Sequence, residues 1–176
     1  KEPILPEHYG CTGQVYAGHV ALLAGQIVKK TGAVSVLDYG CGMRTLEHAL
    51  PPINGMTVHN YDPCIEGLDA RPEPADLVVC TDVLEHVEPE CLENVLNDLQ
   101  RVTKQAIFLA VSTRKAQKTY SDGQNAHKIV EEQDWWRPKL RKRFNIIDTQ
   151  VIPNDKFIMV AQSKALHLPD GCGERN

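Results

Sequence analysis

The stretch Val36-Leu37-Asp38-Tyr39-Gly40-Cys41-Gly42 decides the fold class of this chain. An apolar run ends at an acidic residue, and two glycines separated by one residue follow. This order predicts a buried parallel strand that ends at Asp38, then a sharp turn in which Gly40 and Gly42 let the backbone approach a ligand. A helix is predicted to begin near Thr45, an acceptable N-cap. A strand, a glycine loop and a helix in this order form the nucleotide-binding corner of a doubly wound sheet.

The carboxylate of Asp38 restricts the ligand that this corner accepts. It would repel the phosphates of a dinucleotide, whereas it would attract a ligand with a cationic amino-acid end. A nicotinamide-dependent oxidoreductase would also need a third glycine at position 45, where Thr45 stands. The oxidoreductase stays an alternative, and stabilisation of the protein against unfolding by NAD would support it.

Length and composition narrow the function classes. The chain has 176 residues, enough for one domain with a sizeable core. Its net charge of −4 argues against non-specific electrostatic binding of nucleic acid. No apolar run approaches the roughly 20 residues of a membrane span, so we expect no membrane partner. The six cysteines form no CxxC pair, which favours free thiols in a reducing cytoplasm over disulfides or a zinc site.

The hydrophobic pattern predicts an alternation of strands and helices. Predicted strands cover residues 35–39, 57–61, 76–81, 106–112, 144–152 and 157–162, and predicted helices cover residues 14–30, 45–50, 90–102 and 131–143. Only thirteen residues separate Asp62 from Asp76, which is too short for a helix–strand–helix excursion. We therefore expect an α/β fold with a Rossmann-like doubly wound sheet, mostly parallel, with a C-terminal antiparallel hairpin strand. One domain is expected over residues 1–165, with an N-terminal arm (1–13) and a loose C-terminal tail (166–176).

This order of elements resembles that of class I S-adenosylmethionine-dependent methyltransferases, over about residues 9–163. Three landmarks carry the resemblance: the glycine motif at residues 38–42, the acid Asp62 at the end of the second strand, and the stretch 76–87 (Asp-Leu-Val-Val-Cys-Thr-Asp-Val-Leu-Glu-His-Val). Two departures stand out. Arg44 replaces the third glycine of the family pattern, and the short span after Asp62 removes the usual helix and third strand.

The resemblance implies which residues bind the cofactor S-adenosylmethionine. These are Asp38, Gly40, Gly42, Asp62, Pro63 and Asp82. Asp38 would orient the amino group of the cofactor, and the glycines would allow close approach. Asp62 would accept hydrogen bonds from both ribose hydroxyls. Asp82 would border the methionine part of the cofactor or the substrate.

The reacting face is predicted from Glu85, His86 and His127 at the carboxyl end of the sheet, where open α/β folds place their chemistry. Together with Asp82 this set is similar to the metal site of small-RNA 2′-O-methyltransferases, which implies that Glu85, His86 and His127 hold a divalent metal ion. Two other interpretations stay open: a metal-free histidine that acts as a general base, and a structural role in which the Glu-His pair caps the following helix.

The predicted function is transfer of a methyl group from S-adenosylmethionine to an oxygen or nitrogen of a small or medium acceptor, in the cytoplasm. One alternative is a divalent-metal-dependent RNA ribose 2′-O-methyltransferase, with RNA a less favoured partner than a small acceptor. Another is a non-catalytic nucleoside-binding module. The sequence predicts neither the acceptor nor the oligomeric state.

Overall fold

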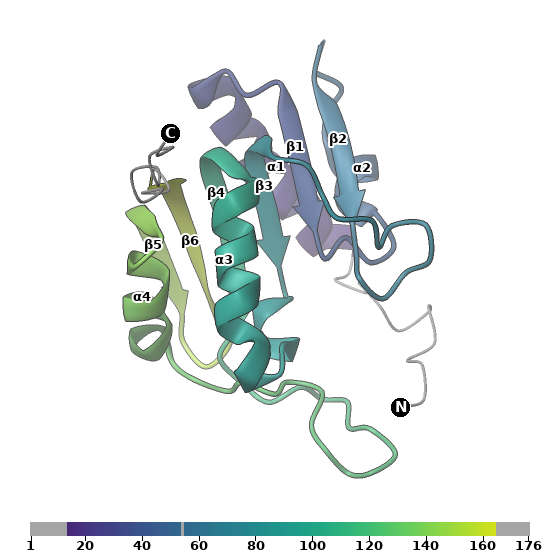
Figure 1. Cartoon of the computed structure of the whole chain (residues 1–176), viewed down its shortest axis with the longest axis vertical. Helices are drawn as coiled ribbons and strands as arrows, with labels where there is room; N and C mark the ends of the chain where they lie inside the picture. The colour runs from purple at the N-terminus through teal and green to yellow at the C-terminus, as the bar shows by residue number, and fades with distance from the viewer. Residues whose placement is uncertain (1–13, 54, 165–176) are drawn as a thin grey trace, which may run out of the picture.

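The computed structural model describes residues 14–53 and 55–164, apart from the side chains of residues 14–17 and 19. The predicted arm (1–13) and tail (166–176) lie outside this part, as do Cys11 and Cys172. Figure 1 shows a single sheet flanked by helices. Its six strands are β1 (Ser35–Tyr39), β2 (Thr57–Tyr61), β3 (Ala75–Thr81), β4 (Thr103–Ser112), β5 (Phe144–Ile152) and β6 (Lys156–Ser163). The helices are α1 (Gln14–Thr31), α2 (Thr45–Ala49), α3 (Leu92–Val102) and α4 (Gln133–Arg141).

The strand order is β2-β1-β3-β4-β6-β5. Strands β2, β1, β3 and β4 pair in parallel, and β6 joins antiparallel between β4 and β5. This arrangement confirms the predicted Rossmann-like sheet with its antiparallel hairpin at the C-terminal side. The register places Ser112, the last residue of β4, opposite Lys156, the first residue of β6. The start of β6 therefore lies at the same edge of the sheet as the carboxyl ends of the parallel strands.

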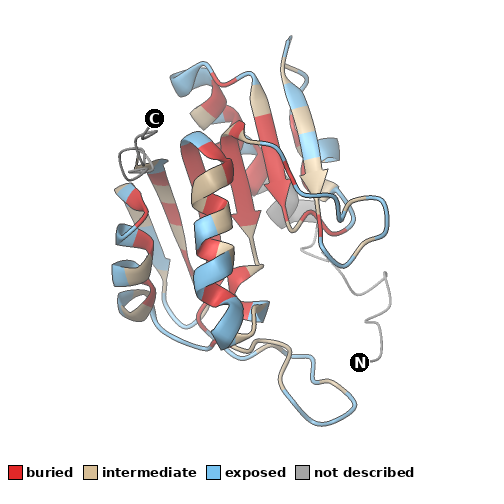
Figure 2. Cartoon of the chain, in the orientation of Figure 1, coloured by how far each residue is buried: buried red, intermediate tan, exposed pale blue. Residues whose placement is uncertain are grey.

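Two apolar layers enclose the sheet, one on each face (Figure 2). Leu77 and Val79 of β3 pack in the cluster that contains the buried face of α1. The alternating residues Val78 and Cys80 pack in the other cluster, with α3 and α4. Because both faces of a central strand are covered, its sequence is an unbroken apolar run, which is why the sequence pattern located it.

The connection from β2 to β3 is a compact loop, as predicted from its length. The backbone N–H of Asp62 donates to the carbonyl of Leu68 at 2.9 Å, and the N–H of Leu68 donates to the carbonyl of Ile65 at 3.0 Å. Further along, Arg101 of α3 donates to the carbonyl of Pro72 at 3.1 Å. Among the described residues, β2 pairs with β1 alone and forms one edge of the sheet.

Some local predictions were wrong. The N-cap of α2 is Arg44, in the left-handed conformation with φ 57°, and Thr45 is already the first helical residue. The helix predicted over 90–102 begins with a 3₁₀ turn, Pro89–Cys91, before α3 starts at Leu92. These differences are of one or two residues, the usual uncertainty of helix ends read from sequence.

Two further observations concern sequence features noted above. Cys41, Cys64, Cys80 and Cys91 are free thiols. None of the helices within residues 14–53 and 55–164 combines the length and hydropathy that crossing a bilayer requires.

Candidate active site

The predicted site residues meet at the carboxyl edge of the parallel strands, the lower edge in Figure 1. The loops after β1 and β2 supply one half of this edge, and the loops after β3 and β4 supply the other half. The first half contains the carboxylates assigned to the cofactor. The second half contains the Glu-His pair and His127.

The glycine loop after β1 is held in place by the end of β2 and by the loop after β3. The N–H groups of Gly40 and Cys41 donate to the carbonyl of Tyr61 at 2.7 and 3.0 Å. Gly40 has φ 80°, and a Cβ built on it would lie 2.3 Å from Cγ2 of Val83. Only glycine fits such a position. Gly40 is therefore required by the Val83 side chain of the loop after β3, and the approach of its backbone to the cofactor stays a prediction.

Asp62 joins the two loops of the cofactor half. Its Oδ2 accepts the N–H of Gly42 at 3.1 Å, and its Oδ1 accepts the N–H of Cys64 at 2.9 Å. The side chain is 6% exposed, and the intervening Pro63 lies exposed on the turn. Each carboxylate oxygen can accept a second hydrogen bond, so Asp62 keeps acceptor capacity toward a ligand.

Asp38 lies buried beside Asp62. Burial, together with the neighbouring charges of Asp62 and Glu47, raises the pKa of its carboxyl from 3.8 to about 7. In the described part of the chain, no hydrogen bond reaches the Asp38 carboxylate. Two neighbouring carboxyls with this little solvation attract a cation, because a positive charge would stabilise both in their ionised form.

Glu85 is the most deeply buried member of the other half. Its Oε1 accepts the N–H of Ser112 at 2.9 Å, while its Oε2 has no hydrogen-bond partner among the described residues. Burial, and after it the charge of Asp82, raise the pKa of Glu85 from 4.5 to about 8. A buried carboxyl oxygen without a partner is unusual in folded proteins and points to a group that completes it.

His86 and His127 lie next to Glu85 with their rings edge to face, 4.7 Å between centroids and 87° between planes. Nδ1 of His86 is 3.0 Å from the carbonyl of Ala126, and Nδ1 of His127 is 2.6 Å from the carbonyl of Arg114. A carbonyl can only accept, so Nδ1 carries the proton in both rings and Nε2 is left to accept or to ligate. Loss of hydration and the neighbouring His127 lower the pKa of His86.

The structure brings the three predicted reacting residues together. One potential ligand atom each from Glu85, His86 and His127 lies within 4.8 Å of the others. The carbonyl of Glu85 also accepts the N–H groups of Lys128 and Ile129 at 2.7 and 3.1 Å, which ties the segment carrying His127 to the loop after β3.

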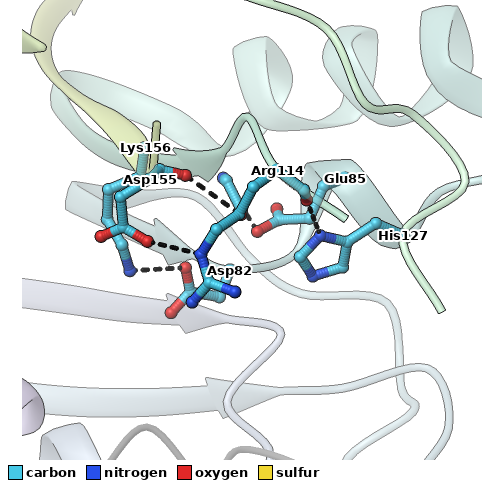
Figure 3. A network of polar contacts seen from close by, with 7 residues as sticks. Asp82, Glu85, Arg114, His127, Asp155 and Lys156 are labelled. Carbon is cyan, nitrogen blue, oxygen red and sulfur yellow. Dashed lines mark hydrogen bonds and ion pairs between the residues drawn. The ribbon is translucent and has the colours of Figure 1, made fainter. Parts of the chain in front are cut away.

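Asp82 lies next to this cluster but faces another partner (Figure 3). Its Oδ1 is 3.2 Å from Nζ of Lys156, and its backbone adopts φ 54°, a left-handed conformation that is uncommon for a residue with a side chain. The backbone N–H of Asp82 donates to the carbonyl of Ala110 at 2.9 Å, which holds the loop in this shape.

The comparisons with known proteins concern the family and the fold. The sequence model of the family described as "Methyltransferase domain" matches residues 14–150, most of the chain. The chain belongs to this methyltransferase family. The resemblance to class I S-adenosylmethionine-dependent methyltransferases is thereby confirmed. No curated protein sequence matches this methyltransferase.

Solved structures share its fold at low sequence identity. One is a 1,6-didemethyltoxoflavin-N1-methyltransferase of Burkholderia thailandensis with bound S-adenosylhomocysteine, with a TM-score of 0.61, 15% identity, and coverage of 86% of this chain and 80% of that chain. Another is the magnesium protoporphyrin IX methyltransferase of Synechocystis PCC 6803, with a TM-score of 0.57, 17% identity, and 86% of each chain covered. The N-methyltransferase NodS of Bradyrhizobium japonicum WM9 has a TM-score of 0.54, 14% identity, and 85% of each chain covered.

Sequence reasoning missed two cations at the reacting edge of this methyltransferase. Lys156 pairs with Asp82, and Arg114 pairs through Nε with Oδ1 of Asp155 at 2.8 Å. A signal for both was present. Arg114 follows a strand that ends at this edge, and an antiparallel β6 must begin there, so its first residue, Lys156, is placed beside the site by topology alone.

Proposed function

We propose that this methyltransferase transfers the methyl group of S-adenosylmethionine to an oxygen or nitrogen of a small or medium acceptor. The observation that carries the proposal is the pair of buried carboxyls, Asp38 and Asp62, on the loops after two adjacent parallel strands. The structural neighbours named above include enzymes for small acceptors, toxoflavin precursors and porphyrins among them. The free thiols suit a reducing compartment, and we place the activity in the cytoplasm.

On the cofactor side, the roles follow from charge and donor chemistry. S-adenosylmethionine carries two positively charged groups, an ammonium and a sulfonium. The Asp38 carboxylate at the buried end of β1 would attract them. Asp62 would accept hydrogen bonds from the ribose while Gly42 and Cys64 hold its carboxylate in place. Pro63 would line the mouth of the same loop.

On the reacting side, the residues can act without a metal. The lowered pKa of His86 keeps its ring neutral near pH 7, with Nε2 available to take a proton from the acceptor. Glu85, with a pKa of about 8, would then be a neutral acid at pH 7. In this arrangement, methyl transfer depends on positioning the acceptor atom in line with the sulfonium, and the histidine removes the proton that the acceptor loses.

The same residues also fit a divalent metal ion. A carboxylate with one buried, unpartnered oxygen and two imidazoles with Nε2 available form a donor set that suits zinc, manganese or iron. The carbonyls that accept from both Nδ1 atoms are the kind of outer partners that orient ligating histidines. When bound, such an ion would lower the pKa of an acceptor hydroxyl.

The metal-ligand set favours a second candidate function, ribose 2′-O-methylation of RNA. Two observations weigh on the other side. Asp82 pairs with Lys156, so it does not act as a fourth ligand in this conformation. Arg143, the last residue of the basic run at residues 137–143, is buried against Glu93 and Asn97, so it is not available to bind RNA at the surface.

Calorimetry with S-adenosylhomocysteine, followed by methyl transfer from labelled S-adenosylmethionine to a panel of small acceptors, tests the proposal. We expect binding and transfer. Binding without transfer to any acceptor would favour the nucleoside-binding module, and binding of NAD instead would favour the oxidoreductase. Activity that survives exhaustive chelation would show that His86 removes the proton of the acceptor without a metal ion. Activity lost on chelation and restored by a divalent ion would assign the ion to the cluster.

A further inference from the structure

The segment that follows β4 is an ordered hairpin at the edge of the site, the long green loop in Figure 1. Thr119 and Asn125 form an isolated antiparallel bridge, and the N–H of Tyr120 donates to the carbonyl of Gln124 at 2.8 Å. The side chain of Asn125 both accepts from the N–H of Ala116 and donates to its carbonyl, each at 2.9 Å. The hairpin therefore has a shape of its own and can present side chains in fixed positions.

The base of this hairpin is joined to the reacting residues. The carbonyl of Arg114 accepts from Nδ1 of His127, and the carbonyl of Glu85 accepts from the next two backbone N–H groups of the chain. The backbone position of Arg114 is thus fixed relative to His127 and Glu85.

The guanidinium of Arg114 is oriented but only partly used. Its Nε is 2.8 Å from Oδ1 of Asp155, and the side chain is 48% exposed. Among the described residues, no hydrogen bond engages its two terminal nitrogens. Figure 3 shows the side chain running from the side of Glu85 and His127 toward Asp155, with its terminal nitrogens drawn over Asp82 in this view. A guanidinium held through Nε presents its remaining N–H groups as a fork, the geometry that binds carboxylate or phosphate.

The charge of the hairpin supports an anionic ligand. Residues 114–128 contain four Arg or Lys side chains and one Asp, a net charge of +3 in a chain whose net charge is −4. The cationic segment lies beside the reacting residues, where Asp155 and Asp82 are each paired with a cation, while the acids Asp38 and Asp62 lie on the cofactor half. A cationic cofactor and an anionic acceptor would each meet the opposite charge.

We propose that the methyl acceptor carries an anionic group, a carboxylate or a phosphate, which binds the terminal nitrogens of Arg114 at the same edge of the sheet as Glu85, His86 and His127. This inference rests on the proposed function, because it assigns the substrate class of the same site. It defines Arg114 as a residue that positions the acceptor, with no part in removing its proton.

The test uses the labelled protein saturated with S-adenosylhomocysteine, titrated with inorganic phosphate and separately with acetate at constant ionic strength. The Nε–H resonance of Arg114 is followed by NMR. We expect saturable shifts, with the stronger anion identifying the preferred group. Arg114→Gln should weaken binding roughly tenfold and Arg114→Lys about threefold, because lysine keeps the charge and loses the fork. Lys115→Gln, which removes the same charge from the adjacent exposed position, should change it less than about twofold.

Several results would overturn the inference. One is the absence of saturable shifts in the wild type, and another is an equal loss of anion affinity in Arg114→Gln and Lys115→Gln. A third is weaker binding of S-adenosylhomocysteine in Arg114→Gln, which would assign the arginine to the cofactor. Tighter binding of a single-stranded RNA oligonucleotide with a steep salt dependence would replace the small acceptor by a polyanion. Failure of S-adenosylhomocysteine to bind the wild type would instead refute the proposed function, so the two failures are distinguishable.

Discussion

Replacing Glu85 by glutamine should make the stability of the protein less dependent on pH. Glu85 is fully buried, and its carboxyl has a pKa of about 8 in the folded protein against 4.5 ordinarily. The folded state therefore binds this proton more tightly than the unfolded chain does. The resulting stabilisation is fully present below pH 4.5 and is lost as the pH rises toward 8.

The size of the effect follows from the shift. One pKa unit corresponds to 1.36 kcal/mol, so ionising Glu85 should lower the free energy of unfolding by about 3 kcal/mol between pH 5 and pH 8. Glutamine can still accept the N–H of Ser112 and does not ionise. Its amide N–H₂ group is placed where Oε2 lacks a partner, and this changes the free energy of unfolding by an amount that does not vary with pH. Asp38 contributes a pH dependence of the same sign, which the variant shares and which cancels in the difference.

Urea unfolding of the wild type and Glu85→Gln at several pH values between 5 and 8, with chelator present, measures this difference. Between pH 5 and pH 8, the free energy of unfolding of the wild type should fall by about 3 kcal/mol more than that of the variant. Glu90→Gln, which removes an exposed carboxylate from the same segment, controls for the loss of one charge. A difference between wild type and Glu85→Gln that stays constant with pH would refute the account of Glu85 as a buried acid.

Three further substitutions test the cofactor half. Gly40→Ala should lower the free energy of unfolding by about 3 kcal/mol, because a Cβ there meets Val83 and φ is positive; the double variant with Val83→Ala should recover part of the loss, and no recovery would contradict the packing argument. Asp62→Asn should weaken S-adenosylhomocysteine binding roughly tenfold in calorimetry, and an unchanged affinity would remove Asp62 from the ribose site. Arg44→Gly should raise the free energy of unfolding by about 1 kcal/mol in urea, since glycine relieves the left-handed backbone at φ 57°; destabilisation would show that the arginine side chain contributes more than the strain.

The arrangement of the sheet followed from sequence because burial and topology leave few choices. The apolar run of β3 is continuous since both of its faces are covered, and the carboxyl ends of parallel strands share one edge. The meeting of Glu85 and His86 with His127 follows from the same rule, because both segments leave strands that pair in parallel.

Other features depend on side-chain packing that no local pattern records. The reason for Gly40 is the position of Val83, which lies more than forty residues away in the chain. The pairing of Asp82 with Lys156 depends on the left-handed backbone at Asp82 and on the register between β4 and β6. In the sequence, Asp82 looks like the other acids of this edge, and its partner becomes visible only once β6 is placed beside β4.

The central claim is that the acids at the carboxyl edge of β1 and β2 bind the nucleoside and amino-acid parts of the cofactor. A crystal structure of the protein grown with S-adenosylhomocysteine tests it most directly. The account predicts electron density with the ribose hydroxyls within hydrogen-bond distance of Asp62 and the amino group near Asp38. Density for the ligand at any other edge of the sheet, or a ribose held by other groups, would contradict it.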